Sequence, residues 1–108
     1  MLPRSKRLNL KKDFKWVSSG KRIETENLKL FINSGSSETC LVGISLSKKN
    51  FGKATDRNRA KRLASAAIEQ LYSTLPKKLN LIIMPKTKIL EISKEVLIKE
   101  LQDALSVN

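Results

Sequence analysis

The chain has 108 residues and a formal net charge of +12, with no histidine and a single cysteine. This length allows one domain with a modest hydrophobic core. The lack of histidine excludes a histidine-based triad, metal site or general base. Cys40 has no partner for an intrachain disulfide, as is usual in a reducing cytosol. We therefore expect one cytoplasmic domain over residues 1–108.

The positive charge is concentrated in two segments. Residues 1–22 contain eight Lys or Arg and one acid, and residues 48–62 contain seven and one. Together they account for the whole net charge, because the remainder is close to neutral. A lysine bias of the source genome would not cluster cations in this way. The clustering indicates a surface that binds a polyanion, and the longest apolar run of the C-terminal half, "LIIM", is too short to cross a membrane.

The first half of the chain predicts one helix and two or three strands. Asn9 is a suitable N-cap and Gly20 a suitable C′ residue for a helix over residues 10–19. Residues 28–33 and 40–47 alternate as strands do, with a turn at 34–38 and a short extra strand around 22–25. The expected inward residues are Leu10, Phe14 and Val17 of the helix, then Leu28, Leu30 and Ile32, then Cys40, Val42, Ile44 and Leu46.

The second half predicts two helices on either side of a buried strand. Thr55 and Asp56 are suitable N-caps for a helix that ends near residues 74–78, and residues 80–84 form a strand closed by Pro85. Ser93 caps a last helix. The expected inward residues are Ala60, Leu63, Ala64, Ala67, Ile68 and Leu71, then Val96, Leu97, Leu101, Ala104 and Leu105. The order of elements is α-β-β-β-α-β-α, an α/β (α+β) fold.

The central helix begins with Arg57, Asn58, Arg59, Lys61 and Arg62. Cations at the positive end of a helix dipole are unfavourable by about 0.3–1 kcal/mol each. A phosphate at that end would meet guanidinium groups, unpaired backbone N–H groups and the dipole together. The alternative is a surface whose cations pair with acids such as Asp56 and Glu69. Because these acids can serve only some of the cations, we expect phosphate binding.

Evidence for other chemistry is weak. Glu24/Glu26 and Glu91/Glu95 are close carboxylate pairs, and neither adjoins a pocket signature. Residues 50–57 lack the second glycine of a phosphate-binding loop. We therefore expect no catalytic residue and no metal ligand in this chain. Three aromatic residues are candidate platforms for unpaired bases, with core packing as the alternative: Phe14, Trp16 and Phe31.

At this point the residues resemble a known family. Residues 42–63, "VGISLSKKNFGKATDRNRAKRL", resemble the signature of the bacterial ribonuclease P protein component. That signature is a strand ending in Ser-Lys-Lys, a glycine-containing loop, and Arg-Asn-Arg followed by Lys-Arg at a helix start. "RLNLKKDFKWVSSG" resembles the first helix of the family, and "NLIIMPK" with the following helix resembles its end. The resemblance covers nearly the whole chain.

The resemblance implies a compact α/β two-layer sandwich with a mixed sheet and a left-handed β-α-β crossover, against the usual right-handed rule. It also implies a subunit that binds the catalytic RNA of ribonuclease P. The 5′ leader of precursor tRNA would lie in a cleft between the first helix and the sheet. Hydrolysis would be carried out by the RNA and the Mg²⁺ ions that it mainly holds. No membrane partner and no obligate protein partner are expected.

Site residues are carried over position by position. The expected RNA-binding residues are Arg7, Lys48, Lys49, Lys53, Arg57, Asn58, Arg59, Lys61 and Arg62. The expected leader-binding residues are Phe14, Trp16 and Phe31. Three positions depart from the family pattern: Ser18 replaces a second aromatic, Ser65 replaces a further arginine, and Asp56 places a negative charge beside the RNA face.

Two rival functions share the charge pattern. One is a small ribosomal or chaperone-like RNA-binding protein without a catalytic partner, which would not require the Ser-Lys-Lys to Arg-Asn-Arg linkage. The other is a DNA-binding helix module. Against the latter, the basic residues stand at a helix start and in a loop, with no dimer signature.

Overall fold

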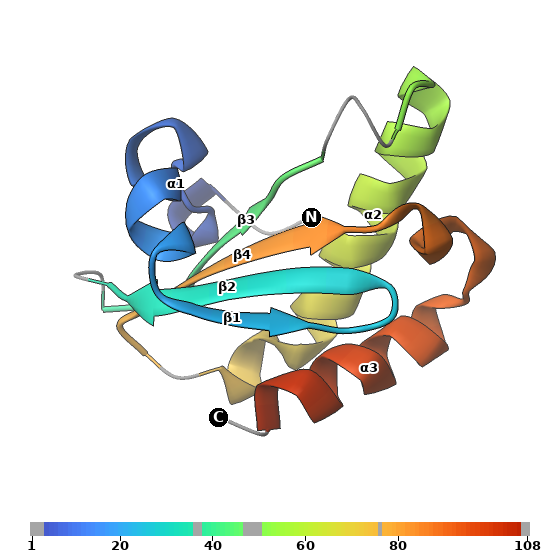
Figure 1. Ribbon diagram of the computed structural model, residues 1–108. Coiled ribbons are helices and arrows are strands. Elements are labelled where there is room, and N and C mark those ends of the chain that lie inside the picture. Colours follow the sequence, from blue (N-terminus) through green and yellow to red (C-terminus); the bar gives the residue numbers. More distant parts are fainter. Residues whose placement is uncertain (1–3, 36–37, 47–50, 76, 107–108) are drawn as a thin grey trace.

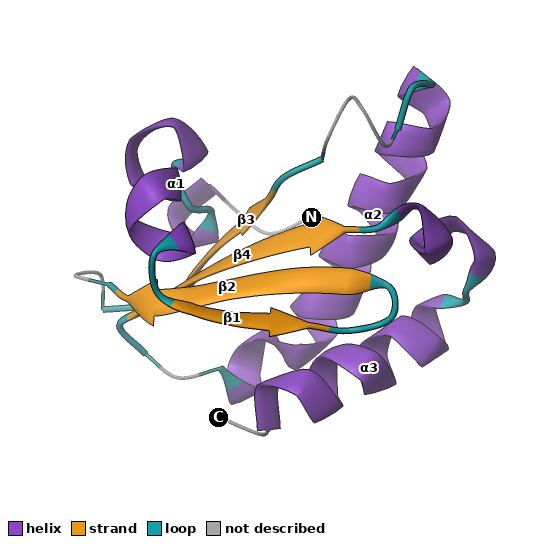
Figure 2. Cartoon of the chain, viewed as in Figure 1, coloured by secondary structure: helices purple, strands orange, loops and turns teal. Residues whose placement is uncertain are grey.

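A computed structural model describes residues 4–35, 38–46, 51–75 and 77–106. Its main elements are α1 (Leu10–Ser18), β1 (Lys21–Glu24), β2 (Leu28–Ser34), β3 (Leu41–Ile44), α2 (Ala54–Leu71), β4 (Leu79–Pro85) and α3 (Lys94–Ser106) (Figures 1 and 2). Short 3-10 helices cover Arg4–Lys6, Tyr72–Thr74 and Thr87–Glu91. The predicted order α-β-β-β-α-β-α is confirmed, including the short strand near residue 22.

The strands form one mixed sheet in the order β1-β2-β4-β3. The β1/β2 and β2/β4 pairs are antiparallel, whereas β3 and β4 are parallel and joined through α2. In Figure 1, β3 and β4 both run toward the upper right, β4 lies below β3, and α2 passes behind the sheet. This geometry makes the β3-α2-β4 crossover left-handed, as the family resemblance implies.

The two faces of the sheet carry different helices. Successive side chains of a strand point to opposite faces of the sheet. Leu30 and Phe31 of β2 therefore lie on different faces, and so do Ile82 and Ile83 of β4. Leu30 and Ile83 belong to the main core with α2 and α3, while Phe31 and Ile82 pack toward α1. We call these the α2/α3 face and the α1 face. The sheet and the α2/α3 layer form the predicted sandwich, and α1 covers part of the opposite face.

The main core lies between the sheet, α2 and α3. Nearly all the predicted inward residues are found there, with the small residues Ala60, Ala64 and Ala67 allowing α2 to lie close to its neighbours. Full burial of a Leu or Ile side chain contributes about 1.5–3 kcal/mol relative to exposure. Two buried members were not predicted: Phe51, before α2, and Ile89, in the 3-10 helix after β4.

The α1 face has a much smaller apolar cluster. Of the residues that the structure describes, Leu8, Val17 and Ile82 are buried there, with Leu10 and Phe14 among the half-buried side chains around them. Asn9 caps α1 as predicted, since its side chain accepts a hydrogen bond from the Lys12 N–H over 3.3 Å. A narrow core and a short helix leave the α1 face only partly covered.

Gly20 is the C′ residue of α1 as predicted, because Ser19 is the C-cap. Its φ is not positive, and glycine is required there because a Cβ would lie 2.3 Å from the Ile32 carbonyl oxygen. Two local predictions need correction. The N-cap of α2 is Lys53 with extended backbone, not Thr55 or Asp56, so Asp56 falls in the first turn, where the dipole favours an acid. Val96 is 51% exposed, because the buried side of α3 is the stripe of Leu97, Leu101 and Ala104.

Candidate nucleic-acid interface

The basic residues of α2 lie on two flanks of its exposed side. Asn58, Arg59 and Arg62 face the start of α3, where they line an open groove of about 740 Å³ together with Lys94. Lys61 lies on the other flank, toward β3 and the N-terminal segment. The predicted motif is therefore divided between two flanks of the helix, with Asn58, Arg59 and Arg62 on one and Lys61 on the other.

Carboxylates do not neutralise these flanks within the part of the chain that the structure describes. Its ion pairs are those of Glu24 with Arg22 (2.7 Å) and with Lys86 (2.8 Å). Hydrogen bonds from Lys86 and Arg22, with their positive charges, lower the pKa of Glu24 to about 2. Over the described ranges, no ion pair joins Arg59, Lys61 or Arg62 to an acid, which is the arrangement expected of an anion-binding surface rather than of a self-paired one.

Arg57 differs from the other cations of the motif. Its Nη1 donates a hydrogen bond of 2.9 Å to the Phe51 carbonyl, and its side chain is half-buried. Phe51 is 1% exposed and belongs to the main core. Arg57 thus holds the segment that leads into α2, and only its remaining N–H groups are free for a ligand.

The other predicted RNA-binding residues are partly brought together. Arg7 forms a parallel bridge with Val42 at the edge of β3, where the neighbouring Leu8 N–H donates 2.9 Å to the Val42 carbonyl. This contact brings Arg7 beside Lys61. Lys53 is exposed at the start of α2. Lys48 and Lys49 lie outside the described residues.

The three candidate aromatic platforms are divided between two places. Phe14 of α1 and Phe31 of β2 lie in the same cluster, both half-buried. Trp16 is 54% exposed and leans on the end of β2, where its Nε1 donates 2.9 Å to the Ser34 carbonyl. It lines a separate hollow whose floor includes Asn80, a buried residue that the sequence did not single out because it stands within an apolar strand.

Comparison with known proteins identifies the family. Residues 2–107 match the family model described as "Ribonuclease P". The chain belongs to the ribonuclease P protein family. It is therefore a protein subunit of the ribonucleoprotein endonuclease ribonuclease P, and its partner is the RNA of that enzyme; a ribosomal or chaperone-like role is not favoured.

Curated relatives in this family include the ribonuclease P protein component of Thermotoga maritima, 29% identical over 82% of this chain and 75% of that protein. The component of Chlamydia trachomatis serovar L2 is 39% identical over 69% of this chain and 63% of that protein. Two solved structures share the fold. They are the ribonuclease P proteins of Thermotoga maritima (TM-score 0.80, 24% identity, 90% and 92% of the two chains) and Staphylococcus aureus (0.78, 18%, 94% and 94%).

The positions that depart from the family pattern have distinct surroundings. Ser18, at the end of α1, donates its hydroxyl to the Lys15 carbonyl over 3.2 Å and offers no aromatic surface. Ser65 is only 4% exposed and lies on the Lys61 flank of α2. Asp56 is half-buried in the first turn. The ribonuclease P motif in this chain therefore ends one helical turn early, at Arg62.

Three further properties bear on the ligands and chemistry of the chain. In the described ranges, no three Cys, Asp or Glu side chains converge as a metal site would require, and none of the described helices is long and apolar enough to span a bilayer. Cys40 is buried, which raises the pKa of its thiol to about 11. A thiol with so high a pKa is protonated at neutral pH and is a poor nucleophile.

Proposed function

We propose that the exposed basic flanks of α2 bind the catalytic RNA of ribonuclease P, and that the α1 face receives the single-stranded 5′ leader of precursor tRNA. The observation that carries this proposal is the set of cations at the start of α2 that have no carboxylate partner among the described residues. Arginine presents a planar fork of donors that suits phosphate oxygens, and it stays charged at any physiological pH.

The electrostatic argument explains why the cations stand at the unfavourable end of the helix. Without a ligand, Arg59, Lys61 and Arg62 repel one another and the positive end of the α2 dipole. A phosphate backbone along this surface attracts both the cations and the positive end of the dipole, and these attractions offset the two repulsions. Release of condensed counterions from the RNA adds to the binding free energy. We therefore propose phosphate contacts by Arg7, Lys53, Asn58, Arg59, Lys61 and Arg62, by Lys48 and Lys49, and partly by Arg57.

The leader proposal rests on the incomplete cover of the sheet. Phe14 and Phe31 meet on the α1 face and are only half-buried, so ring surface stays accessible. A base stacked on an aromatic side chain contributes about 1–3 kcal/mol, whatever its sequence. Trp16 is more exposed but lies over the end of β2, which makes it a candidate for a base at the end of the bound segment.

The chemistry of cleavage is assigned to the RNA. The chain offers no cluster of carboxylates in its described part, and we propose that the Mg²⁺ ions are held mainly by the RNA subunit. Binding at the α2 flanks would orient that RNA, and binding of the leader would favour precursor over mature tRNA. We further propose that the protein works in the cytoplasm and needs no obligate protein partner.

Reconstitution tests the proposal. The full chain, bacterial ribonuclease P RNA and a precursor tRNA are mixed at low Mg²⁺, and release of the 5′ leader is followed. Cleavage should depend on the protein, and Arg59→Ala should reduce both RNA affinity and cleavage without changing the melting temperature. Lys99→Ala, which removes an exposed cation from α3, is the matched control. Equal RNA affinity of Arg59→Ala, Lys99→Ala and the parent would refute the interface.

Salt dependence measures the number of phosphate contacts. The slope of log affinity against log salt is about −0.7 to −0.9 per neutralised phosphate, so a half-dozen contacts give about −4 to −5. Loss of one contact should make the slope of Arg59→Ala shallower by about one, whereas Lys99→Ala should keep the parent slope. A parent slope near −1 would indicate a mainly apolar interface instead.

A further inference from the structure

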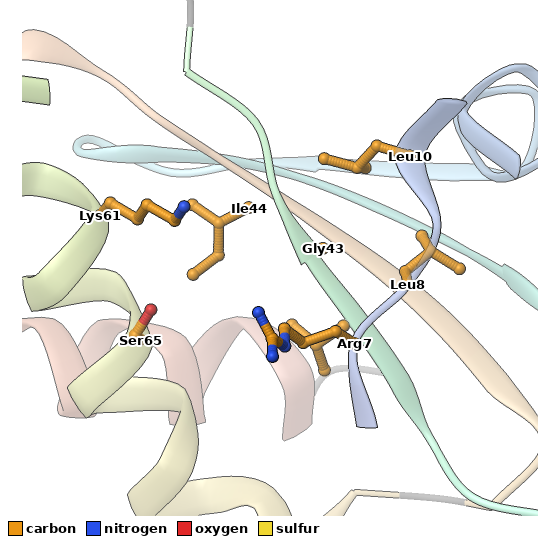
Figure 3. A pocket seen from close by; sticks show the side chains of 8 residues that line it. Arg7, Leu8, Leu10, Gly43, Ile44, Lys61 and Ser65 are labelled. Carbon is orange, nitrogen blue, oxygen red and sulfur yellow. The ribbon is translucent and has the colours of Figure 1, made fainter. Parts of the chain in front are cut away.

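A hollow of about 410 Å³ lies where α1 passes over the end of β2 and the start of β4 (Figure 1). We call it the Trp16 hollow. Its lining comes from α1, from the end of β2 and the residue after it, and from β4: Asp13, Trp16, Ser34, Gly35 and Asn80. It is separate from the cavity of about 150 Å³ beside β3 in Figure 3, which is lined by Arg7, Lys61 and Ser65 among others and belongs to the RNA surface described above.

The floor of the Trp16 hollow contains an unsatisfied hydrogen-bond acceptor. Asn80 is 6% exposed, and its buried Oδ1 has no hydrogen-bond partner among the described residues. Asn33 is its partner across the sheet, but the Asn33 Nδ2 donates to the Trp16 carbonyl over 2.7 Å. A buried acceptor without a partner destabilises the folded protein, so a ligand that brings an N–H donor into the hollow is favoured.

Gly35 lies directly over this acceptor. A Cβ at position 35 would be 2.5 Å from Asn80 Oδ1, and the φ of Gly35 is not positive. Glycine therefore serves the close approach here and not an unusual backbone conformation. The Gly35 N–H donates to the Lys78 carbonyl over 2.8 Å, which fixes the backbone in this place. Any side chain at position 35 would occupy the space beside the acceptor.

The walls of the hollow combine an aromatic ring with a carboxylate. Trp16 is 54% exposed, and its Nε1 donates to the Ser34 carbonyl over 2.9 Å, which orients the indole. Asp13, one turn earlier on α1, is half-buried and adds acceptor oxygens. None of the described residues that line the hollow is a lysine or an arginine. The lining therefore suits a flat ring with N–H donors and not a phosphate group.

The charge of the protein favours a neutral ligand over a cation. A metal ion or an ammonium group would also accept these oxygens as partners, but the chain carries a net charge of +12. Three exposed lysines stand on α1 itself, at Lys11, Lys12 and Lys15, and they repel a cation. The same lysines attract the phosphates on either side of a nucleotide. A neutral nucleobase joined to a phosphate backbone therefore matches both the hollow and its surroundings.

We propose that the Trp16 hollow binds one unpaired nucleobase and prefers bases with an exocyclic amino group, which are adenine, cytosine and guanine, over uracil. The base stacks on Trp16, and its amino group donates to Asn80 Oδ1 and to the Asp13 carboxylate. Uracil has no amino group, and the carbonyl oxygens beside its N–H would face these acceptors.

The base would come from an RNA that the protein binds, so the inference rests on the proposed function. Two sources share this chemistry: the 5′ leader of precursor tRNA and the catalytic RNA. Positions 14 and 16 point about 200° apart around α1, because each helical residue turns by about 100°. The Trp16 hollow is therefore a second base site on the α1 face, in addition to the pair formed by Phe14 and Phe31.

The first experiment uses the full chain and short RNA oligonucleotides at one salt concentration. The chain has a single tryptophan, so its fluorescence reports directly on Trp16. An all-uridine oligonucleotide is compared with two others whose central uridine is replaced by adenosine or by cytidine. Quenching of Trp16 should be stronger with the substituted oligonucleotides, and fluorescence anisotropy of the labelled RNA should show about tenfold tighter binding.

Two variants test the acceptor independently. Asn80→Leu removes Oδ1 at similar side-chain volume, and Gly35→Ala places a methyl group beside it. Each should reduce the affinity for the substituted oligonucleotides to that for the all-uridine one, whose own affinity should not change. Ser18→Ala, which removes a hydroxyl from α1 outside the hollow, is the control and should keep the preference of the parent. Melting curves show that each variant is folded.

Two results would overturn the proposal. One is equal affinity of the parent for all three oligonucleotides. The other is a preference that persists in Asn80→Leu but disappears in Phe31→Ala, which would place base recognition at the pair of phenylalanines.

The second experiment separates the two RNA sources. Precursor tRNAs with all-uridine and adenosine-containing leaders are bound to the complex of protein and catalytic RNA. If the leader supplies the base, Asn80→Leu weakens binding of the adenosine-containing precursor alone. If the catalytic RNA supplies it, Asn80→Leu weakens affinity for that RNA without tRNA, and a loss of neither kind would contradict the proposal. If the parent binds neither RNA, the proposed function fails, while the oligonucleotide titration still decides whether the hollow recognises a base.

Discussion

The two faces of the sheet are built from the same strands but differ in how completely they are covered. Leu30 and Phe31 are neighbours on β2; Leu30 is fully buried under α2 and α3, while Phe31 is half-buried beside α1. Within the described part of the chain, the α2/α3 face holds sixteen buried residues in one cluster, and the α1 face holds three. This difference shows that the stability of the fold depends mainly on one face, which leaves the other able to keep accessible ring surface for a ligand.

The largest expected effect is on the α2/α3 face. Leu30→Ala should lower the free energy of unfolding by about 2–5 kcal/mol, because it removes apolar atoms and leaves a cavity in a packed core. For a domain whose total stability is about 5–15 kcal/mol, this is a large fraction. Urea denaturation followed by circular dichroism measures it. A loss below about 1 kcal/mol would mean that the two faces do not differ as described.

The neighbouring substitution should act on binding more than on folding. Phe31→Ala is expected to lose less stability than Leu30→Ala, since its ring is already half-exposed. It should reduce the ratio of precursor to mature tRNA affinity in the reconstituted complex by about 5- to 150-fold, the equivalent of about 1–3 kcal/mol of stacking. Mature tRNA has no leader and serves as the internal control. An unchanged ratio would place the leader elsewhere and leave Phe31 as a sheet residue.

The cap of α1 gives an effect of intermediate size. Asn9→Ala removes the acceptor for the Lys12 N–H and should cost about 1 kcal/mol of stability. Since α1 is short and covers a small cluster, amide exchange should rise first in residues 10–18, while amides of β4 stay protected. Asn9→Asp, which keeps an acceptor at the helix start, should restore the parent behaviour. Uniform loss of protection across the sheet would show that α1 and the main core unfold as one unit.

The smallest effect concerns acid stability at the β1 edge. The folded-state pKa of Glu24 is about 2, below the ordinary value of 4.5. The stabilising contribution of its ion pairs with Arg22 and Lys86 is therefore fully present above pH 4.5 and is lost as the pH falls from about 4.5 toward 2. Because Glu24 is exposed, the contribution is small. Melting temperatures of Glu24→Gln and the parent should differ slightly at pH 6 and converge near pH 2; a constant difference would assign it to another cause.

Much of the fold follows from the spacing of apolar residues. The alternation in β2 and β3 and the stripe on α2 predict which side chains are buried, because each regular structure has a fixed period. The left-handed crossover came only from the family resemblance, since no local pattern encodes on which side of β3 the next strand will lie. The N-cap of α2 was misplaced because Lys53 caps through its backbone alone, and side-chain propensity cannot reveal that.

The site was predictable in chemistry but not in arrangement. Clustered arginine and lysine residues with few acids indicate phosphate binding, whatever the three-dimensional arrangement of the elements that carry them. The division of the motif between two flanks, and the hydrogen bond of Arg57 to Phe51, depend on how α2 lies against α3 and the preceding segment. The cavity at Ser65 requires Arg7, 58 positions earlier, to be brought to the edge of β3. Long-range contacts of this kind leave no trace in local periodicity.

The position of β4 has a consequence for synthesis on the ribosome. β4 is the third strand of the sheet in space but the last in sequence, and it separates β2 from β3. Until residues 79–85 emerge, β2 and β3 have no strand between them, and Leu30 and Val42 have no neighbour in β4 to pack beside. The sheet therefore closes late, by insertion of a strand into a gap rather than by addition at an edge. A nascent chain arrested before residue 79 should stay protease-sensitive, and protection should appear only after β4 and α3 have left the exit tunnel.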